Sequence, residues 1–274
     1  MNGIVKLSLL ALVLVFSFCK GEKVDENLVE NADTKNAVLE TKLNAQNVFN
    51  AMPDRKEILR LIDEHKIEYN SDFLSDPTLV HKYTVESVKA ANLGIYGSDL
   101  SIASSFDQTQ ESMVFLKCVN LLAGDLGVNS AFDQRMFDRM SANIANKDST
   151  LEIITNAFKT ADEILKSNDR PATSAIILAG AWVEGLHVSS QIAKTLNSEA
   201  IVKSILKQKE SLKNLVILLD AAKLDAGSQY ILTDLKTLQA AYKIAEAEEK
   251  CTVETIKDIT SSVEALRRKI ISGI

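Results

Sequence analysis

The sequence predicts an all-α protein, an antiparallel helical bundle of about nine helices. Aromatic residues make up only 5% of the 274 residues, with 10 Gly and 3 Pro, whereas strands favour aromatic and β-branched residues and frequent turns. From residue 53 onward, apolar residues recur every three or four positions, which buries one face of a helix and leaves the other in water. No stretch alternates convincingly with a period of two, so no strand is predicted.

The first segment of the chain is typical of a secretion signal. After Lys6, an apolar run of about a dozen residues extends to Phe18, and this length suits a signal-peptide core. A permanent membrane-spanning helix would need ~20 apolar residues. Because the polar residues 20–26 follow at once, we expect residues 1–18 to be a cleaved signal peptide.

Cys19 lies at the junction between the apolar run and the polar stretch. A cysteine in this position resembles the lipobox of bacterial lipoproteins, in which a diacylglyceryl group is attached to the thiol before cleavage. The sequence departs from the usual pattern, because Phe18 replaces the usual Gly, Ala or Ser, and Phe16 replaces Leu. Relaxed lipoboxes of this kind are familiar in Bacteroidetes, and residues 20–26 resemble the export tag of that phylum's surface lipoproteins.

The lipobox resemblance implies a lipid anchor, carrying fatty acids such as palmitate, at Cys19. It also implies a place in the cell envelope, attached to the outer membrane and either periplasmic or surface-exposed. A secreted helical protein without lipid is the alternative. Residues 19–50 are rich in Asn, Lys, Glu and Thr and are predicted to form a polar tether, which leaves residues 51–274 as the helical body.

Boundary signals support the helices predicted in the body. Ser149 and Glu152 form a capping-box pattern, and Pro171 suits the first turn of a helix. Short connections favour antiparallel neighbours. Helices are predicted at 53–67, 78–105, 108–126, 130–145, 149–167, 171–196, 199–222, 228–247 and 253–271.

A faint internal repeat links two of these helices. Gly94 aligns with Gly180, 86 positions later, and the same offset pairs other similar residues: Tyr96 with Trp182, Leu100 with Leu186, Ile102 with Val188 and Ser104 with Ser190. Each glycine lies in the first of about four helices. The repeat indicates two related halves, about 78–168 and 169–274, or a chance similarity between helices rich in small residues.

The same two segments resemble uncharacterised helical lipoproteins of Bacteroidetes. The resemblance is carried by residues 92–100 (NLGIYGSDL), 106–111 (FDQTQE), 168–171 (NDRP) and 180–186 (GAWVEGL), and it covers most of residues 80–195. It implies the envelope location and the helical fold, and it implies no chemistry.

The most unusual feature of these segments is a set of glycines inside predicted helices: Gly94, Gly97, Gly180 and Gly185. Each costs ~1 kcal/mol relative to Ala in a helix, so something should compensate. Together with neighbouring Ala and Ser residues they form faces without bulky side chains. Such a face either packs closely on another helix or forms a groove for a ligand or partner. Tyr96 and Trp182, the only Trp, would flank either arrangement.

One metal-binding pattern is present. Glu184 and His187 form an E-x-x-H pair, which places a carboxylate and an imidazole on one helix face, as in di-iron carboxylate bundles. Those sites need a second pair and two further Glu, and neither His65 nor His81 has a Glu three residues before it. We therefore expect no metal and no cofactor, with a metal-binding or redox bundle as the alternative function.

Other chemical signals are weaker still. The chain has no G-x-S-x-G elbow and no Gly-rich phosphate loop, and its formal net charge of −6 argues against nucleic acid as a partner. Cys118 lies in an apolar stretch and is expected to be buried and inert. Asp99 belongs to a polar face that is exposed or interhelical. The sequence thus favours a non-enzymatic binding or scaffolding protein whose partner is an envelope protein or a small ligand.

Overall fold

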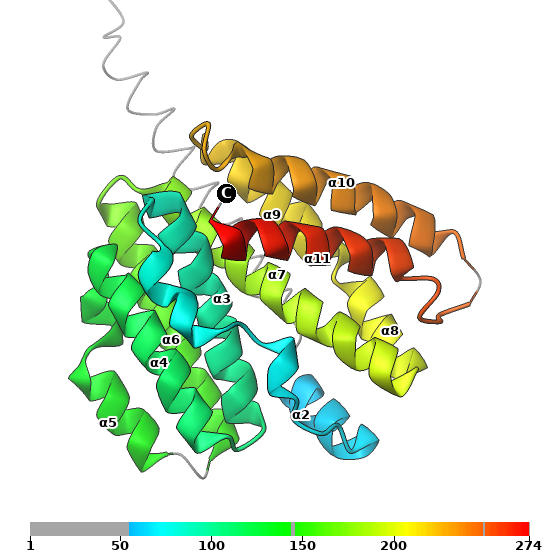
Figure 1. The fold of residues 1–274 in the computed structure, drawn as a ribbon, viewed down its shortest axis with the longest axis horizontal. Coiled ribbons are helices and arrows are strands. Elements are labelled where there is room, and N and C mark those ends of the chain that lie inside the picture. The colour runs from blue at the N-terminus through cyan, green and yellow to red at the C-terminus, as the bar shows by residue number, and fades with distance from the viewer. Residues whose placement is uncertain (1–54, 144–145, 249, 274) are drawn as a thin grey trace, which may run out of the picture. The chain divides into compact units, whose positions relative to one another are not determined.

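The structure of the chain is a computed structural model, which describes residues 55–143, 146–248 and 250–273. Every regular element in these residues is a helix, as Figure 1 shows. The prediction of an all-α bundle is therefore confirmed. The predicted signal peptide, Cys19 and the predicted tether lie outside the described residues.

The described residues contain ten α-helices and three short 3₁₀ helices, which are α2 (Arg55–His65), η1 (Ser71–Phe73), η2 (Pro77–Lys82), α3 (Glu86–Ser105), α4 (Thr109–Asp125), η3 (Asn129–Phe132), α5 (Gln134–Ala142), α6 (Lys147–Ser167), α7 (Pro171–Leu196), α8 (Glu199–Lys207), α9 (Lys209–Ala221), α10 (Gln229–Glu246) and α11 (Lys257–Ser272).

Two predicted helices are interrupted by tertiary packing or by a tightened turn. The predicted helix 78–105 is two elements, η2 and α3, because Tyr83 has an extended backbone and buries its ring against Tyr96, with 6.4 Å between the ring centroids. The predicted helix 199–222 is divided into α8 and α9. At this break the Gln208 amide donates to the Ile205 carbonyl at 3.0 Å, a short-range bond that ends α8.

Other boundaries differ because a different residue caps the helix. The Asn146 side chain accepts a hydrogen bond from the Ser149 amide at 3.0 Å, so α6 begins before the predicted capping residue Ser149. Asp133 caps α5 through the Met136 amide, and η3 replaces the first turn of the predicted helix 130–145. α11 begins at Lys257, four residues later than predicted. α7 has the predicted bounds, with Pro171 in its first turn.

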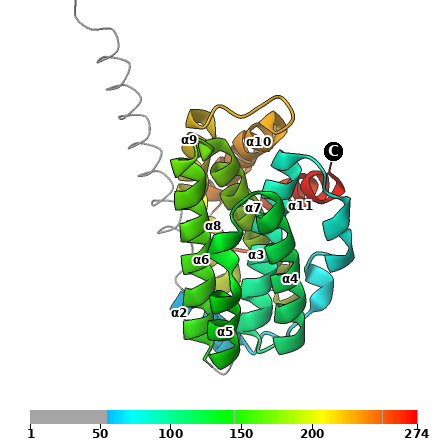
Figure 2. The same ribbon diagram turned by 90° about the vertical axis from the view of Figure 1, so that its left-hand side faces the viewer.

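Helices α3 and α7 form the centre of the body and have the most extensive contact of any helix pair. Both are buried along most of their length, as expected of helices that have apolar residues on several faces. α6 and α11 each contact both central helices. In Figure 2, α6 lies to the left of the central pair and α11 to the right.

The backbones of α3 and α7 touch at two glycines. A Cβ atom on Gly94 would lie 2.0 Å from the Ile177 carbonyl oxygen, and a Cβ on Gly180 would lie 1.9 Å from the Ala91 carbonyl oxygen. Ile177 follows Ala91 by the same 86 positions that separate the glycines, so the two contacts are reciprocal. Reciprocal contacts are what a twofold axis between equivalent helices of two related halves would produce.

Replacing Gly180 by Ala should destabilise the protein, although Ala is the better helix former. The added Cβ meets backbone atoms of α3, so the helices must separate, and overpacking of this kind costs about 1–3 kcal/mol. Gly124 in α4 is the matched control, because a Cβ there meets nothing within 4 Å. Gly124→Ala should stabilise by about 0.5–1 kcal/mol. Urea unfolding of both variants measures the difference, and equal effects would contradict the assigned contact.

Candidate functional site

A cavity of about 600 Å³ lies beside the contact between α3 and α7. Its volume falls within the range of about 300–1,000 Å³ that is usual for small-molecule sites. Residues of α2, α3, α6, α7 and α8 line this space, which we call the α3–α7 cavity. Most of the lining side chains are apolar, including Leu61, Ile102, Phe106, Ile154, Phe158 and Trp182.

Two of the four helix glycines belong to the wall of this cavity. A Cβ on Gly185 would have only the Ser98 hydroxyl oxygen near it, at 3.8 Å, so space is open in front of Gly185. A Cβ on Gly97 would lie 2.1 Å from the Phe158 ring, so the missing side chain makes room for that ring. Both glycines therefore shape the space next to Trp182.

The other predicted groove residues lie elsewhere. Gly94 and Gly180 lie at the contact between α3 and α7, and they are not among the described residues that line the cavity. Tyr96 is fully buried on another side of α3, where its hydroxyl donates to the Asp76 carbonyl at 2.9 Å. The predicted set of small and aromatic residues thus divides into a packing contact and a cavity wall, and Tyr96 and Trp182 do not flank the same space.

Glu184 is held by an arginine from the last helix. Its carboxylate is fully buried and accepts hydrogen bonds from Arg267, from Nε at 2.5 Å and from Nη2 at 2.7 Å. Nη2 also donates to the Ser75 hydroxyl at 3.0 Å. This two-pronged pairing uses both carboxylate oxygens. Among the described residues no group of three or more His, Cys, Asp and Glu side chains could hold a metal.

Asp99 shares this buried cluster and has no cation of its own. The Ser75 amide donates to Oδ2 at 3.2 Å, and Oδ1 has no hydrogen-bond partner among the described residues. Burial and the nearby charge of Glu184 raise the pKa of Asp99 well above its usual value, and Arg267 only partly opposes this shift. Because Arg267 is already paired with Glu184, Asp99 favours its neutral, protonated form.

His187 lies one turn beyond Glu184 on α7. Burial, with a further contribution from the positive charge of Arg267, lowers the pKa of His187 to about 3, so the imidazole is neutral at pH 7. Its Nδ1 atom is buried without a hydrogen-bond partner among the described residues. The E-x-x-H pair predicted from the sequence is therefore one carboxylate bound to arginine and one neutral histidine.

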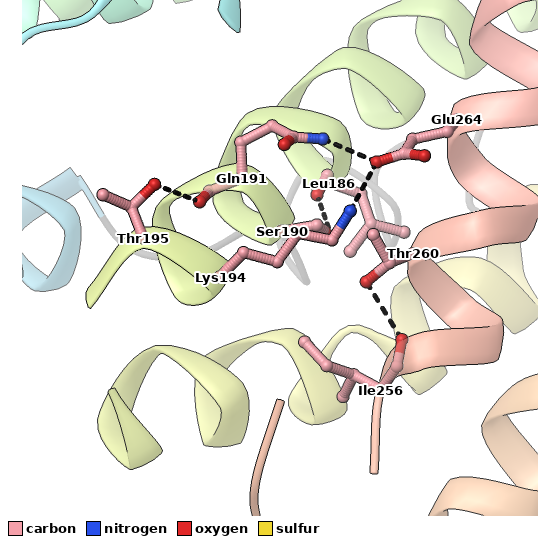
Figure 3. A network of polar contacts seen from close by, with 8 residues as sticks. All are labelled: Leu186, Ser190, Gln191, Lys194, Thr195, Ile256, Thr260 and Glu264. Carbon is pink, nitrogen blue, oxygen red and sulfur yellow. Dashed lines mark hydrogen bonds and ion pairs between the residues drawn. The ribbon is translucent and has the colours of Figure 1, made fainter. Parts of the chain in front are cut away.

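A second set of polar contacts joins α7 to α11, as Figure 3 shows. Glu264 Oε1 accepts hydrogen bonds from Gln191 Nε2 and from Lys194 Nζ, each at 2.7 Å. Partial burial acts to raise the pKa of Glu264, but these two hydrogen bonds outweigh it and keep that pKa below its usual value. The pairing helps to fix α11 against α7 in the register that brings Arg267 to Glu184.

Sequence reasoning identified neither Arg267 and Ser75 of the buried cluster nor Lys159, a residue of α6 that lines the cavity. Arg267 and Glu184 are 83 positions apart, and no local pattern marks such a pair. Cys118, by contrast, is buried as predicted, with its sulfur 3.6 Å from the Pro77 carbonyl oxygen. The Asp99 carboxyl proves to be interhelical and is not exposed.

The stability contributed by Asp99 should fall as pH rises. Its folded pKa lies above the unfolded value of about 4, so this contribution is complete below pH 4 and is lost as pH rises through the folded pKa. Between the unfolded and the folded pKa of Asp99, each pH unit lowers the free energy of unfolding by about 1.4 kcal/mol. Asp99→Asn mimics the protonated form, so the variant's stability advantage over the wild type should grow with pH.

Urea unfolding at pH 4, 6 and 8 tests this dependence on Asp99. Asp63→Asn changes an exposed carboxyl of α2 and is the control. An Asp99→Asn advantage that stays constant with pH, or that shrinks as pH rises, would mean that Asp99 is ionised in the folded protein.

Comparison with known proteins adds no relative from which a function could be transferred. No protein-family model, curated protein or solved structure matches this chain. The resemblance to lipoproteins of Bacteroidetes therefore stays a prediction. Among the described residues, no helix has both the length and the apolar character needed to cross a membrane. The α3–α7 cavity and the charges around it are thus the basis on which a function is inferred.

Proposed function

We propose that this protein is a lipid-anchored, non-enzymatic binding protein of the cell envelope that takes up a small apolar ligand in the α3–α7 cavity. The observation that carries the proposal is the cavity itself, about 600 Å³ in volume and walled mainly by apolar side chains. A ligand that buries apolar surface there gains roughly 0.8 kcal/mol for each methylene group removed from water.

The polar groups of the wall support binding by burial. Four hydroxyls are engaged with carbonyls of their own helices at 2.8–2.9 Å: Ser101, Ser105, Thr155 and Ser189. The Ser174 hydroxyl donates to Asp162, so five of the seven hydroxyls of the wall have their donor hydrogen engaged. Only Lys159 and Asp162 are ionisable among the described residues of the wall. A ligand recognised here would be held mainly by shape and apolar contact.

The close backbone contact between α3 and α7 supports a wall of fixed spacing. The wall is built on α3 and α7, whose separation is set by backbone contact at Gly94 and Gly180. A cavity that is already formed before binding spares the ligand the cost of reorganising the protein. The metal-binding alternative has no comparable support, because Arg267 occupies both oxygens of Glu184.

Filling the cavity at Gly185 should weaken ligand uptake. The uncharged dye N-phenyl-1-naphthylamine, which fluoresces in apolar surroundings, serves as the probe with the purified full chain. Trp182, the only Trp, lines the cavity, so its excitation should sensitise the bound dye. Gly185→Leu should weaken dye binding at least about tenfold, the loss expected when roughly two methylene-sized contacts are blocked.

Gly124→Leu is the control for this experiment. It adds the same side chain to an exposed helix position outside the cavity, where a Cβ meets nothing within 4 Å. Equal dye affinity in the two variants, or no dye binding by the wild type, would overturn the proposed function.

The envelope anchor is tested separately at Cys19. Cells fed radioactive palmitate should label the wild-type chain and leave Cys19→Ala unlabelled, because the thiol is the predicted attachment point. Labelled wild-type protein should sediment with membranes. An unlabelled wild-type chain released into the medium would instead identify a secreted protein without lipid, and the cavity would keep its proposed role.

A further inference from the structure

We propose that the ligand of the α3–α7 cavity is a single-chain amphiphile with an anionic head group, a molecule of the fatty-acid type, and that Lys159 binds the head group. This inference rests on the proposed binding function and goes further, because it assigns the chemical class of the ligand and the residue that selects it.

Lys159 is the unbalanced charge of the cavity wall. It lies on α6, is half-buried, and makes no hydrogen bond or ion pair with any described residue. The second ionisable residue of the wall, Asp162, is already satisfied: Lys166 Nζ lies 2.8 Å from its Oδ2, and the Ser174 hydroxyl donates to Oδ1. The net charge offered to a ligand is therefore positive.

The position of Lys159 suits an amphiphile. A half-buried lysine lays its methylene stem on apolar surface and keeps its ammonium group near water. A ligand whose chain fills the apolar interior would bring its head group to such a boundary. An anionic head would then receive a charge-assisted hydrogen bond, whereas a cationic head would be repelled.

The remaining wall favours a flexible alkyl chain over a polar ring. Its apolar part is largely aliphatic, and five of its seven hydroxyls already donate to a carbonyl of their own helix or to Asp162, which leaves few donors for a sugar or a nucleotide. Gly185 leaves room where a side chain would otherwise narrow the space. One unpaired positive charge in a mainly apolar wall suits a single-chain amphiphile with an anionic head group.

Three probes, each with a ten-carbon chain, test the assignment with the purified full chain in detergent-free buffer at pH 8: decanoate, 1-decanol and decyltrimethylammonium. Quenching or a shift of Trp182 fluorescence reports occupancy, and calorimetry gives an independent affinity. Wild type should bind decanoate about tenfold or more tightly than decanol, the factor expected for a charge-assisted hydrogen bond, and should bind the cation most weakly.

Lys159→Met keeps most of the length of the side chain and removes its charge. It should reduce the preference for decanoate over decanol to less than about threefold while leaving decanol affinity unchanged, which also shows that the fold is intact. Lys117→Met, at an exposed position of α4 outside the cavity, should leave the preference unchanged. If Lys159→Met keeps the full preference, the head-group assignment is wrong and the cavity remains a binding site. If wild type binds none of the three probes, the proposed function fails as well.

Discussion

The direct contact between the backbones of α3 and α7 is the constraint on which the rest of the body depends. At Gly94 and Gly180 a methyl group would already collide with carbonyl oxygens of the facing helix. The intrinsic helix-forming cost of the two glycines is offset by this close approach, which lets the central helices share a long buried surface. Helices α6 and α11 each pack against both members of this central pair.

The two sides of the central pair have different chemistry. On one side, α6 and α8 leave the α3–α7 cavity, with glycines and serines where larger side chains would fill it. On another side, α11 brings Arg267 onto Glu184, and the space around Asp99 is closed. Buried ion pairs are weak contributors to net stability but costly to break, so this cluster selects one docking position of α11 more than it strengthens the fold. A firmly docked α11 keeps α7, and with it one wall of the cavity, in place.

Charged groups are arranged differently in the buried cluster around Glu184 and in the α3–α7 cavity. The buried cluster holds two fully buried carboxyls and one largely buried arginine, with a buried, neutral histidine beside them. The cavity holds one paired carboxylate and one lysine without a partner among the described residues. Glu184 and His187, which form the metal-binding pattern in the sequence, therefore belong to the packed interior between α7 and α11. The lysine that had no distinguishing pattern is the one available to a ligand.

Periodicity and composition were sufficient to predict the fold class and the positions of most helices. The 3.6-residue period and the capping rules act within a few neighbouring residues, so they can be recognised in the sequence. Pro171 marked the start of α7, and the four glycines marked the central pair. Local signals could not tell the glycines of the contact from those of the cavity, since Gly94 and Gly97 differ only in which helix lies opposite.

The break before α3, the pairing of Arg267 with Glu184 and the unpaired state of Lys159 were likewise decided by the tertiary structure. Each depends on which side chains the packed helices place next to one another. Buried polar groups are costly unless they are paired, so the packing also decides which of them find partners. The sequence by itself determined which segments are helical and which faces are apolar. Only the packing of those faces decided where a cavity remains and which charge is left at its edge.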